Sequence, residues 1–218
     1  AAPLYVSSTE SSLSVYWTAP QEVHSCPLYG YELFVDTGAG DAITNQVGGA
    51  LEPHVTSYTI PLSASDASKT FGVQLVAHND AGSVSSGIGS FLLADTPEAP
   101  DAPVNDAAVT NETRIKVNFA ETLPAGRGST ILAVQLAMDD GAGGDFVLVV
   151  GQDEAKTTLA TSYTAEALVK GQTYRLKCRV LNAIGWSDWS TETYIVAAIA
   201  PAAPRAPTLL SATATEMS

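Results

Sequence analysis

Apolar and polar side chains alternate along short segments of this chain, most informatively in YRLKCRVLNAIGWSDWS at residues 174–190. Alternation with a period of two is typical of a β-strand that has one buried face. A weaker copy, FGVQLVAHNDAGSVSS, occupies residues 71–86, where Phe71 matches Tyr174 and Gly82 matches Gly185. A repeat of this length is one whole β-domain rather than a solenoid unit. The pattern therefore predicts two β-domains.

Further alternating runs, separated by turn signals, give each repeat its strands. In the first repeat we predict strands at 4–8, 13–18, 29–35, 42–47, 56–60, 71–79 and 88–94. In the second we predict them at 104–109, 113–119, 131–138, 146–150, 162–165, 174–181 and 191–197. This number of short strands indicates immunoglobulin-like sandwiches. Their alternation predicts two cores, one containing Trp17, Tyr31, Leu33 and Leu75, the other Phe119, Val134, Leu136 and Cys178.

Both repeats resemble fibronectin type III domains over nearly the whole chain. In the first repeat the resemblance is carried by Pro3, Trp17, Tyr31, Asn79 and Gly82, and in the second by Pro103, Leu168, Gly171, Tyr174, Asn182 and Gly185. Phe119 departs from the family pattern by replacing a strand Trp, and Phe71 by replacing a corner Tyr that would donate or accept a hydrogen bond. The resemblance implies an all-β fold of two tandem fibronectin-type-III/immunoglobulin-like β-sandwiches.

Proline spacing divides the chain further. Pro97, Pro100 and Pro103 are three residues apart, and so are Pro201, Pro204 and Pro207. Because polyproline II has three residues per turn, each triplet favours a semi-rigid spacer over a floppy linker. We therefore expect domain 1 at 1–96, a Pro-rich linker at 97–103, domain 2 at 104–198, a second linker at 199–207 and a further strand at 208–218.

The last segment has two interpretations. Residues 206–218 align without a gap on residues 2–14, so the segment is either the start of a third domain or a strand that adds to another subunit. Strand addition would satisfy its backbone and bury Leu209, Leu210 and Met217, which makes these the candidate self-assembly residues.

The segment WSDWS is similar to the WSxWS box of class I cytokine receptors. It contains Trp186 and Trp189, while Arg175, Lys177 and Arg179 alternate on the outward face of the preceding strand. Cations stack favourably on indole rings. We therefore predict a Trp/Arg ladder that stabilises its own domain rather than a ligand site.

The low charge and one glycosylation sequon indicate a modified or assembled surface. Only 15% of residues are charged, fewer than usual, which favours glycans or a protein partner covering the surface. Asn111 begins an Asn-Glu-Thr sequon. Clustered prolines are hydroxylated and O-glycosylated in some extracellular fibrous proteins, which makes Pro97, Pro100, Pro201, Pro204 and Pro207 further candidates.

Other chemistry finds little support. The loops 36–41 and 140–145 carry paired Asp around glycines, which suits β-turns better than calcium. The histidines, His24, His54 and His78, share no catalytic or metal spacing, and Cys26 and Cys178 do not form a disulfide framework. We therefore expect no enzyme activity, no metal and no cofactor.

The expected partners follow from charge and hydropathy. A net charge of −13 argues against nucleic acid and anionic membranes, and no run of 18 apolar residues would insert in a bilayer. The sequence thus predicts a glycosylated structural subunit of a secreted or cell-surface array, fibril or helical filament, partnered by copies of itself or by neighbouring domains. The alternative is a receptor or adhesion ectodomain fragment that binds a protein ligand through its loops.

Overall fold

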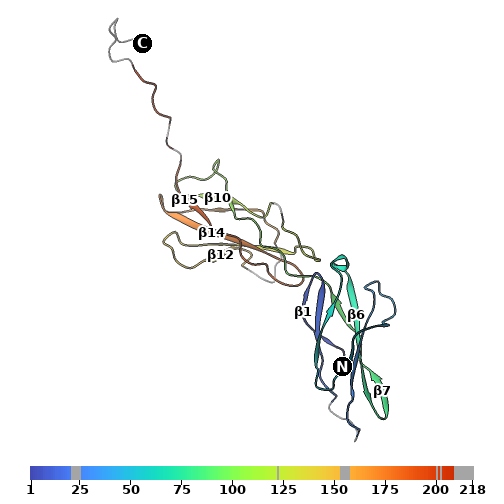
Figure 1. Cartoon of the computed structure of the whole chain (residues 1–218). Helices are drawn as coiled ribbons and strands as arrows, with labels where there is room; N and C mark the ends of the chain where they lie inside the picture. Colours follow the sequence, from blue (N-terminus) through green and yellow to red (C-terminus); the bar gives the residue numbers. More distant parts are fainter. Residues whose placement is uncertain (21–25, 122, 153–157, 200, 202, 209–218) are drawn as a thin grey trace, which may run out of the picture.

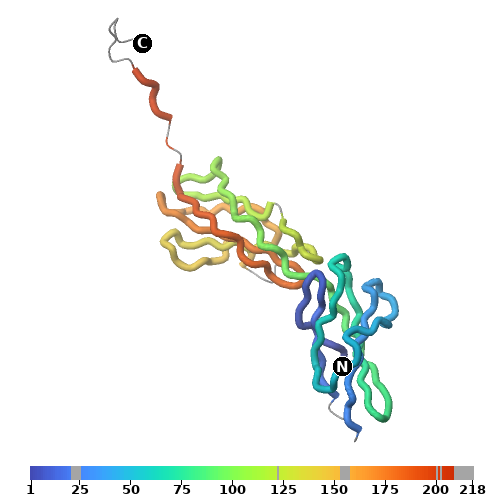
Figure 2. The backbone as a smooth tube through the Cα atoms, viewed as in Figure 1, coloured from blue at the N-terminus to red at the C-terminus, as the bar shows by residue number. Residues whose placement is uncertain are grey.

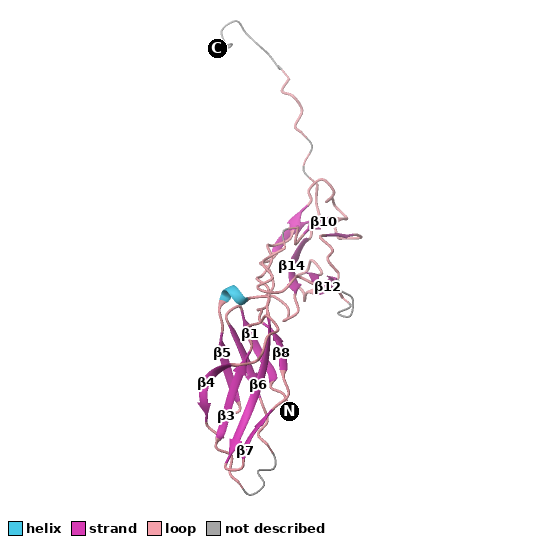
Figure 3. Ribbon diagram, turned by 90° about the vertical axis from the view of Figure 1, so that its right-hand side faces the viewer, coloured by secondary structure: helices cyan, strands magenta, loops and turns pink. Residues whose placement is uncertain are grey.

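The chain forms two antiparallel β-sandwiches that meet end to end (Figure 1). This computed structural model describes residues 1–20, 26–121, 123–152, 158–199, 201 and 203–208. Within that part of the chain, the only helix is a short 3-10 turn, η1 (Ala64–Asp66), drawn in cyan in Figure 3. The predicted fold class is confirmed.

The first sandwich consists of two sheets. One has the order β1 (Leu4–Thr9), β2 (Ser12–Tyr16) and β5 (Ser57–Pro61). The other has the order β4 (Asn45–Leu51), β3 (Gly30–Val35), β6 (Thr70–Asn79) and β7 (Gly82–Ser85), and β8 (Gly89–Leu92) also pairs with β6.

The second sandwich repeats this topology. Its smaller sheet has the order β13 (Ser162–Ala165), β10 (Ile115–Asn118) and β9 (Val104–Asn105). The larger sheet has the order β12 (Val147–Val150), β11 (Ala133–Met138), β14 (Thr173–Leu181) and β15 (Thr193–Val196). The central pairs, β3 with β6 and β11 with β14, set the frame in which the two sandwiches can be compared residue by residue.

Each predicted strand has a counterpart in the structure, with bounds that shift by a few residues. β7 was not predicted as a separate strand. All four of its residues are exposed, so they show no apolar alternation, and the strand forms because the turn 79–82 folds it back on β6. In the second sandwich the equivalent segment forms no strand and meets β14 at the isolated bridge Leu181–Trp186.

The two predicted cores are confirmed. The buried residues of the first sandwich include Trp17, Tyr31, Leu33 and Leu75, and those of the second include Phe119, Val134, Leu136 and Cys178. Trp17 and Tyr31 meet edge to face, with ring centroids 5.6 Å apart. Such a contact adds to the stabilisation from burial alone.

The tyrosine corner is present in the second sandwich only. The Tyr174 hydroxyl accepts the backbone N–H of Val169 at 2.9 Å, across a turn in which Gly171 has φ of +78°. A positive φ is readily adopted by glycine. Phe71 occupies the equivalent position in the first sandwich and is buried without a hydroxyl.

The first proline triplet is not a free spacer. Pro97, Pro100 and Pro103 are all buried, and the Thr193 hydroxyl donates to the Pro103 carbonyl at 2.6 Å. The segment 97–103 therefore packs along the second sandwich, because its prolines turn one apolar edge towards it. The second triplet differs: Pro201, Pro204 and Pro207 are exposed, and their segment leads away from the second sandwich (Figure 2).

Candidate binding and assembly surfaces

The outward face of β14 carries a ladder of alternating cations and rings. The Arg179 guanidinium lies 4.6 Å from the ring centroids of both Trp186 and Trp189. The Lys177 ammonium lies 5.1 Å from the ring centroid of Trp189 and 4.0 Å from that of Phe146. Alternate residues of a strand share a face, so the order of rings and cations follows from the strand itself.

Arg175 completes the ladder on Phe146 rather than on a tryptophan. Its guanidinium carbon lies 4.8 Å from the Phe146 centroid. The sequence placed Arg175 in the ladder but gave no sign of Phe146, which reaches this face from the far side of the β11–β12 turn. The ring row is thus one member longer than expected.

Two serines hold the WSDWS segment to β14. The backbone N–H groups of Ser187 and Ser190 donate to the carbonyls of Val180 and Cys178, each at 2.8 Å. Their hydroxyls accept the N–H groups of the same two residues, at 3.1 and 3.0 Å. This reciprocal pairing fixes the backbone beneath both indoles, and it was not predicted from the sequence.

A buried carboxylate anchors the Arg175 end of the ladder. The Asp139 side chain is 1% exposed, and its Oδ2 accepts Arg175 Nε at 2.8 Å. Its Oδ1 accepts the backbone N–H of Arg175, also at 2.8 Å, and Arg175 Nη2 donates to the Gly144 carbonyl at 2.6 Å. The hydrogen bond to Asp139 is the main cause that raises the pKa of the Arg175 guanidinium.

The same position of the first sandwich has the aspartate without the arginine. Asp36 N–H donates to the Gly72 carbonyl at 3.1 Å, as Asp139 N–H donates to the Arg175 carbonyl at 3.1 Å. Asp36 therefore corresponds to Asp139. The turn sequences alone, 36–41 and 140–145, would instead match Asp36 with Asp140. Gly72 takes the place of Arg175.

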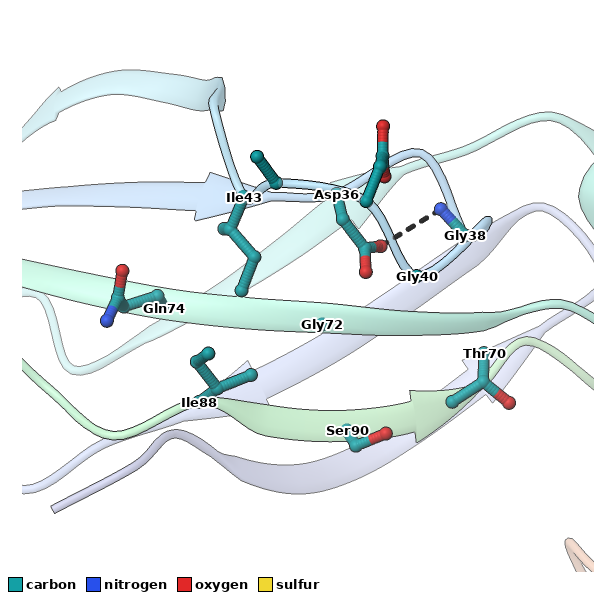
Figure 4. Close-up of a pocket in the computed structure, with 11 residues that line it drawn as sticks. Asp36, Gly38, Gly40, Ile43, Thr70, Gly72, Gln74, Ile88 and Ser90 are labelled. Atoms are coloured by element: carbon teal, nitrogen blue, oxygen red, sulfur yellow. Dashed lines mark hydrogen bonds between the residues drawn. The ribbon is translucent and has the colours of Figure 1, made fainter.

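An open pocket of about 630 Å³ lies over Gly72 (Figure 4). Ile43 and Ile88 flank it, Asp36 lies at its base, and Ser90 lies on the neighbouring strand. The sequence repeat contained a signal for this pocket, because its alignment sets Gly72 against Arg175.

A joint between the sandwiches is built around Arg127, in the loop that precedes β11. Its Nη2 lies 2.7 Å from Asp95 Oδ2, and its Nε lies 3.4 Å from Glu10 Oε2. Its carbonyl accepts the N–H of Asp95 at 2.8 Å. Glu10 belongs to the β1–β2 turn of the first sandwich, so one arginine of the second sandwich contacts both the connecting segment and the first sandwich.

Asn182 and Gly128 complete this joint. The Asn182 amide is buried and donates to the carbonyls of Asp95 at 2.7 Å and Gly126 at 2.9 Å. A Cβ on Gly128 would lie 2.8 Å from the Leu93 carbonyl oxygen, so only glycine allows this approach of the two backbones. The sequence marked Asn182 as a turn residue but did not reveal that it binds the interdomain segment.

The predicted modification residues fall into three groups. Asn111 is half-buried on the turn before β10, and its Oδ1 accepts the Thr113 N–H at 3.0 Å. Pro201, Pro204 and Pro207 are exposed. Pro97 and Pro100 are buried, which argues against glycans there and corrects the expectation for these two prolines.

The acidic turns have local partners. Asp41 Oδ1 accepts the Thr37 N–H at 3.0 Å, and this bond is the main cause that lowers the pKa of Asp41. Asp140 Oδ1 accepts the Ala142 and Gly144 N–H groups, which likewise lower the pKa of Asp140. In the described ranges, no three His, Cys, Asp or Glu side chains gather as they would around a metal.

The remaining candidates lie apart from these surfaces. His78 pairs with Glu32 at 3.0 Å, and His54 is exposed. The self-assembly residues Leu209, Leu210 and Met217, and also His24, lie outside the described residues. No helix in the described part of the chain has the length and apolarity needed to cross a bilayer.

Comparisons with known proteins support the fold. No family model matches the sequence, and no curated protein does. Among solved structures, the chain is similar to the FN1–FN3 domains of chicken CNTN1, with a TM-score of 0.53 and 17% sequence identity. The match covers 91% of this chain and 66% of the chicken fragment. The chain therefore has a fibronectin type III-like all-β fold.

Proposed function

We propose that this chain is a stiff structural segment of a secreted or cell-surface repetitive array or fibre. The observation that supports this role best is the joint around Arg127, which ties the second sandwich to both the connecting segment and the first sandwich. Because several partly buried contacts converge on one short segment, bending at this joint would break them together. A stiff joint of this kind would hold neighbouring domains at a fixed spacing and orientation, as a repeating scaffold requires.

Stiffness can be tested by spin-label distance measurements. Cysteines at the exposed positions Thr59 and Thr161, in a Cys26→Ser background, place one label on each sandwich while Cys178 remains buried. We expect a narrow distance distribution in the parent chain and a clearly broader one after Arg127→Ala.

The matched control is Arg114→Ala. Arg114 pairs with Glu166 at 3.2 Å on the second sandwich, away from the joint, so this change should leave the distribution narrow. A broad distribution in the parent chain, or one that Arg127→Ala does not widen, would contradict the proposed rod.

Assembly into the fibre is the second part of the proposal. The match of residues 206–218 to residues 2–14 supports strand addition between copies, through Leu209, Leu210 and Met217. Exposed Leu4 and Val6 on the edge strand β1 offer an acceptor with apolar side chains. Glycans at Asn111 and at Pro201, Pro204 and Pro207 would hydrate the outer surface.

Negative-stain imaging distinguishes this arrangement from a covalent array. We expect the parent chain to form filaments and a chain lacking residues 206–218 to remain monomeric. Filaments that persist without the segment would rule out strand donation and leave the interpretation of residues 206–218 as the beginning of a further domain.

A receptor or adhesion ectodomain fragment is the second candidate function. The observation that favours it is the pocket over Gly72, since an open acidic pocket on a sheet face can accept a side chain from a protein ligand. A fragment of this kind would be monomeric and would bind its ligand at a defined face.

A further inference from the structure

In the second sandwich, the aspartate that directly follows β11 forms a buried ion pair. Asp139 is buried there and receives both the backbone N–H and the Nε of Arg175, each at 2.8 Å. The guanidinium also lies on Phe146 and donates to the Gly144 carbonyl. A buried carboxylate is costly unless a cation and hydrogen bonds compensate it, and Arg175 supplies both.

The first sandwich keeps the carboxylate but lacks its cation. Asp36 is only 6% exposed, and its Oδ1 accepts the Gly38 N–H at 2.9 Å. Among the residues that the structure describes, none donates a hydrogen bond to its Oδ2. A Cβ built on Gly72 would lie 3.0 Å from that oxygen, so Oδ2 faces the space that Arg175 fills in the other sandwich.

The surroundings of this space suit a flat cation. The same Cβ would lie 3.2 Å from Ile43 Cδ1 and 3.5 Å from Ile88 Cγ2, so two aliphatic side chains border the opening (Figure 4). Gln74 donates its amide to the Ser86 carbonyl at 2.9 Å, which leaves its own amide oxygen as an acceptor. Ser90 adds a hydroxyl on the adjacent strand.

We propose that this pocket binds the guanidinium of an arginine side chain presented by a protein partner, with Asp36 Oδ2 accepting its N–H groups between Ile43 and Ile88. The partner's arginine would occupy the place that Arg175 occupies in the second sandwich. This inference does not rest on the proposed array function, because it concerns the first sandwich alone.

Arginine fits the pocket better than the other cations. A guanidinium is planar, weakly hydrated and carries a fork of donors, whereas a lysine ammonium is compact and strongly hydrated. A calcium ion takes six to eight oxygen ligands, and the neighbouring Asp41 carboxylate already accepts a backbone N–H. The net charge of −13 also favours the approach of a cationic partner.

A titration followed by amide NMR tests the site with a defined probe, N-acetyl-arginine methylamide. We expect saturable shifts of the Gly38, Gly72 and Ser90 amides, with a dissociation constant on the order of 1 mM, which corresponds to a binding free energy of about −4 kcal/mol. N-acetyl-lysine methylamide should bind at least about tenfold more weakly. Equal binding of the two probes at these amides would overturn the proposal.

Two variants isolate the carboxylate. Asp36→Asn should weaken binding of the arginine probe by about tenfold or more, because the charged acceptor is lost. Asp80→Asn removes one negative charge from an exposed turn of the same sandwich and should leave binding unchanged within about twofold. If Asp36→Asn binds the arginine probe as the parent does, the assignment is wrong.

A second pair of variants keeps the test valid even where Asp36→Asn fails to fold. Gly72→Arg should fill the pocket from within and abolish probe binding, because the backbone of Gly72 lies outside the left-handed region. The new Cβ would lie 3.0 Å from Asp36 Oδ2 and 3.2 Å from Ile43 Cδ1, so these two atoms need to shift by a few tenths of an ångström. Arg175→Gly should open the equivalent space beside Asp139 and confer binding of the same probe on the second sandwich. Retained probe binding in Gly72→Arg would place the probe elsewhere and contradict the inference.

Discussion

Replacing both Trp186 and Trp189 with alanine is the most direct test of the ladder. The change removes three cation–ring contacts, two made by Arg179 at 4.6 Å and one made by Lys177 at 5.1 Å. Each such contact contributes about 0.5–1 kcal/mol at a partly exposed site, so their loss costs about 1.5–3 kcal/mol. For a domain of this size the melting temperature should fall by about 6–24 °C.

Differential scanning calorimetry measures the effect, and the first sandwich provides the internal control. Of the three Trp residues in the chain, only Trp17 remains in the double variant, so its fluorescence reports unfolding of the first sandwich alone. We expect that fluorescence transition to stay in place while the calorimetric transition of the second sandwich moves down.

A double-mutant cycle separates stacking from simple burial of the rings. Lys177→Met keeps the aliphatic stem and removes the cation, so combining it with Trp189→Ala isolates the coupling between the two side chains. A coupling of about 0.5–1 kcal/mol is expected. If the double tryptophan variant keeps its melting temperature but loses binding to a protein ligand, the ladder is a recognition site and the structural interpretation is refuted.

Two further predictions concern buried groups of the second sandwich. Tyr174→Phe leaves the Val169 N–H without its acceptor and should lower the free energy of unfolding by about 1–2 kcal/mol in urea titrations, whereas Tyr194→Phe, at an exposed hydroxyl, should change it by less than about 0.5 kcal/mol. Equal losses would contradict the role of the corner. Burial raises the pKa of Cys178 to about 11 from 9.0, so the folded thiol keeps its proton while the unfolded thiol releases it. The stability contributed by the thiol is therefore complete below pH 9 and is lost as the pH rises towards 11, and the wild type should lose more stability over this window than Cys178→Ala does; parallel curves would refute the assignment.

The sequence predicted strands and cores well because both depend on local alternation. Leu33 and Leu136 are fully buried, as their period-two placement requires, and the sheet registers pair them with Leu75 and Cys178. β7 was missed because its four exposed residues carry no such pattern, and its existence depends on a turn that folds it against β6. Local patterns report which face is buried, but not which polar segment completes a sheet edge.

The candidate sites were predictable only in part, because their partners are distant in the sequence. The outward cations of β14 follow from alternation, whereas Phe146 meets them only after β11 and β12 have formed. The Arg127 joint depends on how one sandwich docks on the connecting segment, and nothing in the loop sequence indicates the partners Glu10 and Asp95. The buried first proline triplet shows the same limit, since spacing by three predicts an extended segment but not whether that segment is free.

The two sandwiches carry a buried carboxylate at equivalent positions, Asp36 and Asp139, and its surroundings differ between them. At Asp139 the chain supplies its own guanidinium, and the face of the second sandwich is closed by a row of rings and cations. Beside Asp36, Gly72 occupies the position equivalent to Arg175, and the face of the first sandwich is open. The central strand pairs β3–β6 and β11–β14 are common to both sandwiches, and on them the two faces differ at Gly72 and Arg175. On the site proposed above, exchanging an arginine for a glycine on the same strands would turn a surface that stabilises its own domain into one that accepts a side chain from a partner.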